Sequence, residues 1–144
     1  MLFLDVNLLL YAHRAESLQH GAARTWLENA LVGSQPLGFA NIVLSSFVRV
    51  ATHPRIFDPP STMNEACEFV DLLREAPVCV PTNPGPMHWA HFRELCAVPG
   101  VKGGLVTDAY LAAIAIEHRC TFATHDADFK RFTPMLTITD PLAG

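Results

Sequence analysis

Charged residues are scarce in this 144-residue chain, and it has no long apolar runs. Charged side chains make up 17% of the residues and hydrophobic ones 50%, a balance that argues against intrinsic disorder. No apolar run approaches the roughly 18–20 residues of a membrane span. The N-terminus has neither a basic region nor a small-residue cleavage site, so we expect no signal peptide. These absences favour a folded, cytoplasmic protein without membrane contact.

The sequence also lacks a C-x-x-C pair. Its four cysteines are scattered, at Cys67, Cys79, Cys96 and Cys120. This pattern favours reduced, mostly buried thiols over disulfides. His88 and His91 lie three positions apart on an expected helix, but no third zinc ligand accompanies them. We therefore expect them to be ordinary surface or boundary residues.

An excess of basic residues is missing too. The formal net charge is −4, which is not the basic balance expected of a protein that grips nucleic acid by its phosphates. An acidic metal site with a local basic rim is compatible with this charge, so a nuclease is not excluded.

Short apolar segments alternate with amphipathic ones along the chain. The length indicates one domain, residues 1–142. The expected strands are 1–4, 36–40, 78–80, 121–124 and 136–139. The expected helices are 7–13, a run from 17 or 19 to about 32, 41–53, 62–76, 87–98, 105–119 and a short one ending at 132. Such alternation predicts an α/β fold with a parallel sheet covered by helices on both faces.

Three helix starts carry capping signals. Asn41 is expected to cap the helix after the second strand, and Thr62 the next one, with Glu65 completing a capping box. Thr107 is expected to cap the alanine-rich helix near residue 105. That cap places Asp108 in the first turn, where the helix dipole favours a carboxylate. The glycine-rich segment 99–104 before this helix lacks the G-K-[ST] of a phosphate-binding loop.

Asp5 is the only charged residue in the first eleven, MLFLDVNLLLY. A charge in such apolar surroundings is costly unless it is paired, hydrogen-bonded or bound to a metal. Asp5 ends the first expected strand and Asp126 follows the fourth, and parallel sheets bind ligands beyond the carboxyl ends of their strands. If those strands are neighbours, Asp5, Asp108 and Asp126 converge at one edge of the sheet, with Asp128 within reach.

Three carboxylates in one low-dielectric pocket repel one another, and a divalent cation removes that cost. Oxygen ligands favour Mg²⁺ or Mn²⁺, which can lower the pKa of a bound water and orient a phosphodiester. The acids together therefore indicate metal-dependent phosphoryl hydrolysis. Taken singly, each has a simpler interpretation, because Asp108 suits a helix start and Asp126 and Asp128 suit a turn.

These residues occur in motifs that resemble those of PIN-domain ribonucleases and, within them, the VapC toxins of type II toxin–antitoxin systems. The motifs are Asp5-Val6-Asn7, Thr107-Asp108-Ala109, Thr124-His125-Asp126-Ala127-Asp128-Phe129, the segment 47–57 (FVRVATHPRIF), His88-Trp89, and Phe132 with Asp140-Pro141-Leu142. Each motif is short, but their order and spacing are specific over residues 1 to about 142.

The resemblance implies a PIN-like three-layer sandwich with a five-stranded parallel sheet of order 3-2-1-4-5. It also implies Mg²⁺- or Mn²⁺-dependent endonucleolytic cleavage of transfer or ribosomal RNA, which would inhibit translation. The catalytic metal ligands would be Asp5, Asp108 and Asp126, with Asp128 as a further candidate. The supporting polar groups would be Asn7, Ser46 and Thr107.

The same resemblance implies partners, because VapC toxins are typically dimers neutralised by a small VapB antitoxin whose C-terminal segment enters the acidic groove. We therefore expect a homodimer, an antitoxin partner and an RNA substrate. The basic residues that could contact RNA or antitoxin are Arg14, Arg49, Arg55, Lys102 and Lys130, with Arg131 beside the last. Arg49 lies in an otherwise apolar helix and could pair with the acids instead.

The chain departs from the family pattern in one acid. Many PIN nucleases carry a glutamate at the start of the helix after the second strand, but residues 41–49 contain no acid. The nearest polar groups are Ser45 and Ser46. One anion fewer should weaken metal binding or prevent a second metal ion from binding. Gly104 is a second departure, because an asparagine is frequent there.

Three other kinds of protein compete with an active ribonuclease. A catalytically weak PIN-fold module could act by holding RNA and antitoxin, and the missing glutamate motivates this alternative. A haloacid-type phosphatase needs D-x-D after the first strand, where the third position here is Asn7. A response-regulator receiver needs an acceptor aspartate after the third strand, where residues 81–84 read PTNP. The phosphatase and the receiver both fit poorly.

Overall fold

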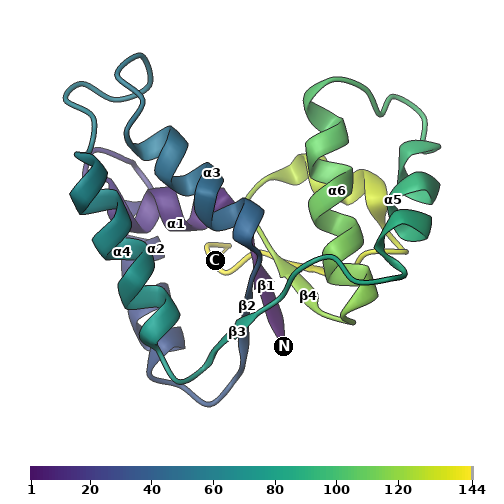
Figure 1. Ribbon diagram of the computed structural model, residues 1–144, viewed down its shortest axis with the longest axis horizontal. Coiled ribbons are helices and arrows are strands. Elements are labelled where there is room, and N and C mark those ends of the chain that lie inside the picture. The colour runs from purple at the N-terminus through teal and green to yellow at the C-terminus, as the bar shows by residue number, and fades with distance from the viewer. Residues whose placement is uncertain (144) are drawn as a thin grey trace.

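The computed structural model describes residues 1–143 as a parallel sheet covered by helices on both faces (Figure 1). The strands are β1 (Leu2–Leu4), β2 (Leu37–Phe39), β3 (Cys79–Pro81), β4 (Thr121–Ala123) and β5 (Ile138–Thr139). All neighbouring pairs are parallel, and the order is β3-β2-β1-β4-β5. The expected order is confirmed, although four strands are shorter than expected and β3 is displaced by one residue.

The helices divide between the two faces of the sheet. One side carries α1 (Val6–His13), α2 (His20–Leu31), α3 (Asn41–Ala51) and α4 (Met63–Glu75), and the other carries α5 (His88–Cys96) and α6 (Gly104–Glu117), as Figure 1 shows. A 3-10 helix, η1 (Ala127–Phe132), follows β4. The chain steps from β1 through β2 to β3 and then returns past β1 to β4. Because crossovers are right-handed, this reversal moves the helices to the opposite face and leaves a crevice between β1 and β4.

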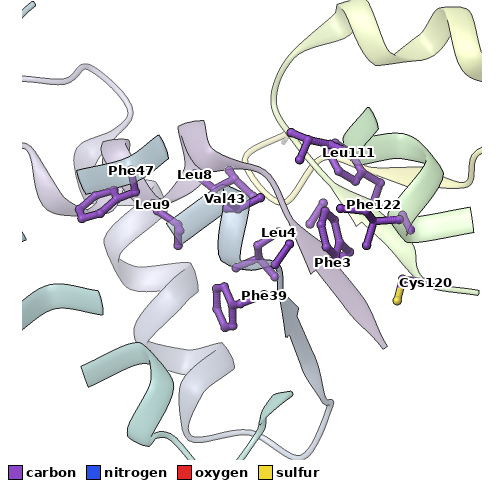
Figure 2. Packing of buried hydrophobic residues seen from close by; sticks show 14 of the residues in the cluster. Phe3, Leu4, Leu8, Leu9, Phe39, Val43, Phe47, Leu111, Cys120 and Phe122 are labelled. Atoms are coloured by element: carbon purple, nitrogen blue, oxygen red, sulfur yellow. The ribbon is translucent and has the colours of Figure 1, made fainter. Parts of the chain in front are cut away.

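The core packs on both faces of β1, since alternate residues of a strand point to opposite sides. Phe3 stacks on Phe122 of β4, with ring centroids 5.6 Å apart. Figure 2 shows Phe3 on the side of α6 and Leu4 on the opposite side, toward Phe39. These four side chains are at most 1% exposed. Burying each stabilises the fold by roughly 1.5–3 kcal/mol, so the position of β1, and of Asp5 at its end, is firmly fixed.

The start of α6 differs from the sequence expectation. The cap is Gly103, whose φ of 56° is accessible to glycine, and the helix already begins at Gly104. The first turn of α6 therefore contains no acid. The prediction that Thr107 caps this helix, with Asp108 in its first turn, is wrong, so the helix dipole does not explain Asp108.

The cap of α3 also comes from elsewhere. Asn41 is the first helical residue, and its backbone N–H donates to Oδ1 of Asn83 at 2.8 Å. The prediction that the Asn41 side chain caps α3 is therefore wrong. Local sequence cannot reveal this cap, because the donor and acceptor are 42 positions apart.

His88 is a core residue of α5, which corrects the expectation of a surface or boundary histidine. It is 4% exposed, and its Nε2 donates to the backbone carbonyl of Tyr110 at 3.0 Å.

The four cysteines are free as predicted, but Cys120 alone is buried and Cys67 is exposed. Within residues 1–143, no helix combines the length and the apolar character needed to cross a lipid bilayer.

The predicted capping box of α4 is confirmed. Oγ1 of Thr62 accepts from the backbone N–H of Glu65 at 3.1 Å, and Oε1 of Glu65 accepts from the backbone N–H of Thr62 at 2.9 Å. Both N–H groups would otherwise lack a partner within the helix.

Replacing Thr62 with alanine should lower the free energy of unfolding by about 1 kcal/mol, because the side-chain acceptor of the capping box is lost. Urea unfolding followed by circular dichroism measures this change. The matched control is Thr25→Ala, at an exposed threonine inside α2, which should be neutral or slightly stabilising. A loss for Thr62→Ala no larger than that of the control would contradict the prediction.

Candidate metal centre

A cavity of about 140 Å³ lies where β1 and β4 end, bounded by α1, α3, α6 and η1. Its charged and polar lining residues are Asp5, Asn7, Ser46, Arg49, Thr107, Asp108 and Asp126. A larger groove of about 360 Å³ between α1, α2 and α4 is mainly apolar, and its single acidic lining residue is Glu28. The smaller cavity is therefore the candidate for chemistry, at the switch point where such sheets bind ligands.

Thr124, directly after β4, links the acidic residues to one another. Its Oγ1 donates to Oδ2 of Asp5 at 2.7 Å and accepts from the backbone N–H of Asp126 at 3.0 Å. Oδ1 of Asp126 in turn accepts from the backbone N–H of Asp128 at 2.9 Å. Thr124 is 2% exposed and Asp5 3% exposed, so the deep end of this chain of hydrogen bonds is shielded from water. The fold therefore sets the spacing of the acids before any ligand binds.

Three carboxylates approach one another closely. Asp108, Asp126 and Asp128 each offer an oxygen, and these oxygens all lie within 4.8 Å of one another. Asp5 lines the same cavity but lies outside this close group. The predicted trio of Asp5, Asp108 and Asp126 therefore shares one cavity, and Asp128, the less certain candidate, belongs to the tightest cluster.

Burial raises the pKa of two of these acids. It raises the pKa of Asp5 from 3.8 to about 6, against the opposing hydrogen bonds from Thr124 and the backbone of Val6, and nearby Asp108 and Asp126 add to the rise. Burial also raises the pKa of Asp108 to about 6, helped by Asp126 and Asp128 and opposed by Arg131. The carboxylates thus lack sufficient compensating positive charge.

The side chains fit a hard divalent cation. The acidic donors at the cavity are carboxylate oxygens, which such ions prefer, and none of its lining residues is a cysteine or histidine. The raised pKa values of Asp5 and Asp108 mean that positive charge at this place would be favourable. The acidic cluster can therefore serve as a binding site for such an ion.

The α3 wall of the cavity carries no acid, as the sequence indicated. Ser46 and Arg49 line the cavity from this helix. Arg49 is exposed, and it forms no ion pair with any acid within residues 1–143. The interpretation in which Arg49 pairs with the acids is therefore not supported, and its guanidinium is available to an anionic ligand.

The other two predicted supporting residues also reach the cavity. Asn7, in the first turn of α1, and Thr107, which precedes Asp108 on α6, both line it. Three of the basic candidates are exposed and do not line it: Arg55 in the α3–α4 loop, Lys102 in the α5–α6 loop, and Lys130 in η1.

Arg14 is held by the α3–α4 loop. Its guanidinium donates to Oγ of Ser61 at 3.0 Å and to the carbonyl of Pro59 at 2.7 Å, and it lies 4.4 Å from the centre of the Phe57 ring. These contacts give Arg14 a role in fixing that loop, and the structure does not bring it to the cavity.

Thr124 is the residue of the site that sequence reasoning missed. The available signal was a threonine hydroxyl two positions before a turn residue, a spacing at which the hydroxyl can bond the backbone N–H of that residue. In the structure Thr124 makes this bond with Asp126. The bond to Asp5 has no sequence signal, because it requires the pairing of β1 with β4.

Comparison with known proteins finds relatives over the whole chain. The family model described as PIN domain matches residues 2–133. The chain is 42% identical over 142 residues to ribonuclease VapC31 of Mycobacterium tuberculosis, covering 99% of this chain and 100% of the relative. It is 39% identical to ribonuclease VapC25 of the same organism, with the same coverage of both.

Solved structures share the fold at lower sequence identity. VapBC2 from Rickettsia felis, bound to a DNA fragment from its promoter, gives a TM-score of 0.69 at 19% identity and covers 97% of this chain and 98% of that one. VapC20 of M. tuberculosis, described as a sarcin–ricin loop cleaving toxin, gives 0.68 at 14% identity, covering 92% and 95%. At these identities the likeness concerns the fold alone.

In the absence of divalent ions, the protein should be less stable at neutral pH than at mildly acidic pH. The folded protein holds protons on Asp5 and Asp108 up to a pKa of about 6, against 3.8 for an ordinary aspartate. Between these values the folded state binds more protons than the unfolded state, so stability falls as the pH rises from about 4 to about 6 and stays lower above that range.

Thermal unfolding in EDTA at about pH 5 and about pH 7.5 measures this fall. Asp5→Asn should reduce the fall, because an amide can still accept the bond from Thr124 but cannot ionise. Asp71→Asn, at an exposed site on α4, should behave like the wild type. A wild-type melting temperature that is equal or higher at neutral pH would refute the prediction.

Proposed function

The chain belongs to the PIN domain family and, within it, to the VapC ribonucleases, and from this premise we propose that it is the toxin of a type II toxin–antitoxin pair that cleaves RNA with a divalent metal ion. The observation that carries the proposal is the cavity in which Thr124 holds Asp5 and Asp126 beside Asp108. A full-length identity of 42% to a named ribonuclease supports the reaction class.

The proposed cofactor is Mg²⁺ or Mn²⁺. The carboxylates that would hold it are Asp5, Asp108 and Asp126, with Asp128 in the same cluster. When bound, the ion supplies a polarised water and neutralises charge on the phosphodiester. The all-oxygen donor set supports this choice of ion.

The side chains of the protein orient the reaction in this proposal. Thr124 keeps the carboxylate of Asp5 and the backbone of Asp126 at a fixed separation. Asn7 and Thr107 line the cavity next to Asp5 and Asp108 and can hydrogen-bond the ligands of the site. Arg49, which lines the α3 wall without an acidic partner among the described residues, would bind a phosphate oxygen of the RNA, for which a guanidinium is well suited.

The proposed substrate is a structured cellular RNA, transfer or ribosomal, so the proposed place of action is the cytoplasm. VapC20, a fold neighbour, is described as cleaving the sarcin–ricin loop, and this supports a structured RNA as the class to test first. Arg55, Lys102 and Lys130 are exposed on loops and on η1. These three basic side chains would contact RNA phosphates and so provide local positive charge in a protein whose net charge is −4.

The proposed partner is a VapB-type antitoxin, and the proposed assembly of the toxin is a homodimer. Fold neighbours include a VapBC complex from Rickettsia felis and FitAB bound to a DNA fragment. A cationic segment of an antitoxin would complement the acidic cavity, because Asp5 and Asp108 have raised pKa values in its absence.

The absence of an acid on the α3 wall favours one alternative, a catalytically weak module that arrests growth by holding RNA. The wall presents Ser46 and Arg49 where many PIN nucleases have a glutamate. Toxicity by RNA cleavage needs the metal-binding carboxylates, whereas toxicity by RNA holding does not. Variants of Asp5 and Asp108 therefore separate the two functions.

Asp5→Asn and Asp108→Asn should each reduce cleavage of total transfer and ribosomal RNA by about 100-fold or more, because each removes a carboxylate from the metal site. The antitoxin-free protein is incubated with Mg²⁺ or Mn²⁺, and the 5′ ends of the fragments are mapped. Asp71→Asn serves as the matched control and should cleave like the wild type. Equal cleavage by Asp5→Asn and the wild type would disprove the role of Asp5. Growth arrest that survives Asp108→Asn would favour the RNA-holding alternative.

Arg49→Ala should raise KM for RNA about tenfold and lower kcat less, because a phosphate contact is lost while the carboxylates remain. Arg49→Lys should recover part of the loss, since it restores charge without the two-pronged geometry. Steady-state cleavage of a fluorescent hairpin copied from the mapped site measures both constants. Arg93→Ala, at an exposed site on α5, is the control, and a KM for Arg49→Ala equal to that of this control would count against the phosphate contact.

A further inference from the structure

A pair of rings beside the acidic cavity has no part in the metal site. His125 stands between Thr124 and Asp126, and its ring meets the ring of Tyr11 edge-on, with centroids 6.3 Å apart and planes at 81°. Tyr11 comes from α1 and His125 from the turn after β4, so the pair spans the same junction as the acids. Neither residue lines the cavity itself.

Asp140 fixes the orientation of the His125 ring. Oδ2 of Asp140 lies 2.8 Å from Nδ1 of His125, and its Oδ1 accepts from the backbone N–H of Leu142 at 2.9 Å. Since both carboxylate oxygens of Asp140 are engaged, the ring is held at one nitrogen by a side chain that is itself hydrogen-bonded to the backbone. The other nitrogen, Nε2, has no hydrogen-bond partner within residues 1–143, and the side chain is 35% exposed.

Tyr11 lies on the same helix as two residues that line the cavity. It lies four residues after Asn7 on α1, so the two side chains share one face of that helix, and Asn7 lines the cavity. Burial raises the pKa of Tyr11, and the charges of Asp5 and Asp126 raise it further. The ring is half-buried and therefore offers a firm surface beside the metal site.

We propose that Tyr11 and His125 form a subsite for the nucleotide next to the cleaved bond, with Nε2 of His125 bonded to the ribose–phosphate backbone and Asp140 acting as a positioning residue. The inference rests on the proposed ribonuclease function and adds a substrate contact to it. Unstacked nucleotides of RNA are commonly held by aromatic and histidine rings together with backbone contacts. The His125 ring, whose Nδ1 is held by Asp140 and whose Nε2 has no partner among the described residues, can make such contacts, and it lies one residue from Asp126.

A purely structural role accounts for only part of these observations. The bond between His125 and Asp140 joins the turn after β4 to the segment after β5, and that link would stabilise the fold. It does not require an open Nε2 or an adjoining tyrosine ring, and it adds a carboxylate, Asp140, beside an already acidic cluster. An asparagine at position 140 could link the same groups without that charge, because its oxygen can accept from the backbone N–H of Leu142 and its NH2 can donate to an unprotonated Nδ1 of His125.

The test measures RNA binding separately from cleavage. In an Asp5→Asn background with EDTA present, the probe is a fluorescent hairpin copied from the mapped cleavage site of the wild type. His125→Ala and Tyr11→Ala should each weaken binding about tenfold, as loss of a stacking or backbone contact does. Tyr11→Phe, which keeps the ring, should bind within about twofold of the parent. His91→Ala on α5 is the matched histidine control and should bind like the parent.

Position 140 tests the positioning role. Asp140→Asn, which can still hold the ring by donating its NH2 to Nδ1 of His125, should bind RNA like the parent, and Asp140→Ala should resemble His125→Ala. The same variants in the wild-type background should show the effect mainly in KM. A purely structural role predicts lower melting temperatures with unchanged binding by the folded protein. If His125→Ala fails to fold, His125→Gln, which retains a polar group toward Asp140, replaces it.

The chemical nature of the contact follows from modified hairpins. A single 2′-deoxy substitution that abolishes the difference between the parent and His125→Ala identifies the ribose hydroxyl, and a single methylphosphonate that does so identifies the phosphate. Binding by folded His125→Ala or His125→Gln equal to the His91→Ala control overturns the inference. If the wild type neither cleaves nor binds RNA, the proposed function fails first, and the two failures are thereby distinguished.

Discussion

The hydrogen bond from Thr124 to Asp5 is the contact on which the site depends. It joins residues 119 positions apart, at 2.7 Å, across the ends of two adjacent strands. Burial and, to a smaller extent, the repulsion between carboxylates disfavour their charged forms, and this cost is visible in the raised pKa values of Asp5 and Asp108. The packing of Phe3 on Phe122 and the parallel pairing of β1 with β4 provide the rigidity that offsets this cost.

Much of the fold could be predicted, because apolar periodicity and capping signals are local properties of a sequence. The strand order required the family resemblance as well, since residue patterns alone do not say which strands are neighbours. The errors fell where distant residues decide the local structure: Asn83 caps α3 from 42 positions away, and His88 is buried because its ring bonds the Tyr110 carbonyl. The start of α6 also differs from the prediction, because Gly103 adopts a positive φ, which composition does not reveal.

The acids of the candidate site were predictable because each follows or flanks an apolar element, where a charge is conspicuous. The bond from Thr124 to Asp5 was not, since it becomes apparent only when the pairing of β1 with β4 is known. The contacts of the arginines in the folded protein could not be predicted either. Arg14 and Arg49 look alike in sequence, but one is bound by the carbonyl of Pro59 and the hydroxyl of Ser61, and the other lines the cavity without an acidic partner among the described residues.

The parallel pairing of β1 with β4 has a consequence for biosynthesis. Asp5 is synthesised before β4 and Thr124, which follow it by more than a hundred residues. Until β4 has been synthesised and has paired with β1, a nascent chain contains Asp5 but cannot form the cluster of carboxylates. Contacts of such long sequence separation are also slow to form. The order of synthesis therefore delays assembly of the cluster until most of the domain exists, and truncated translation products lack it.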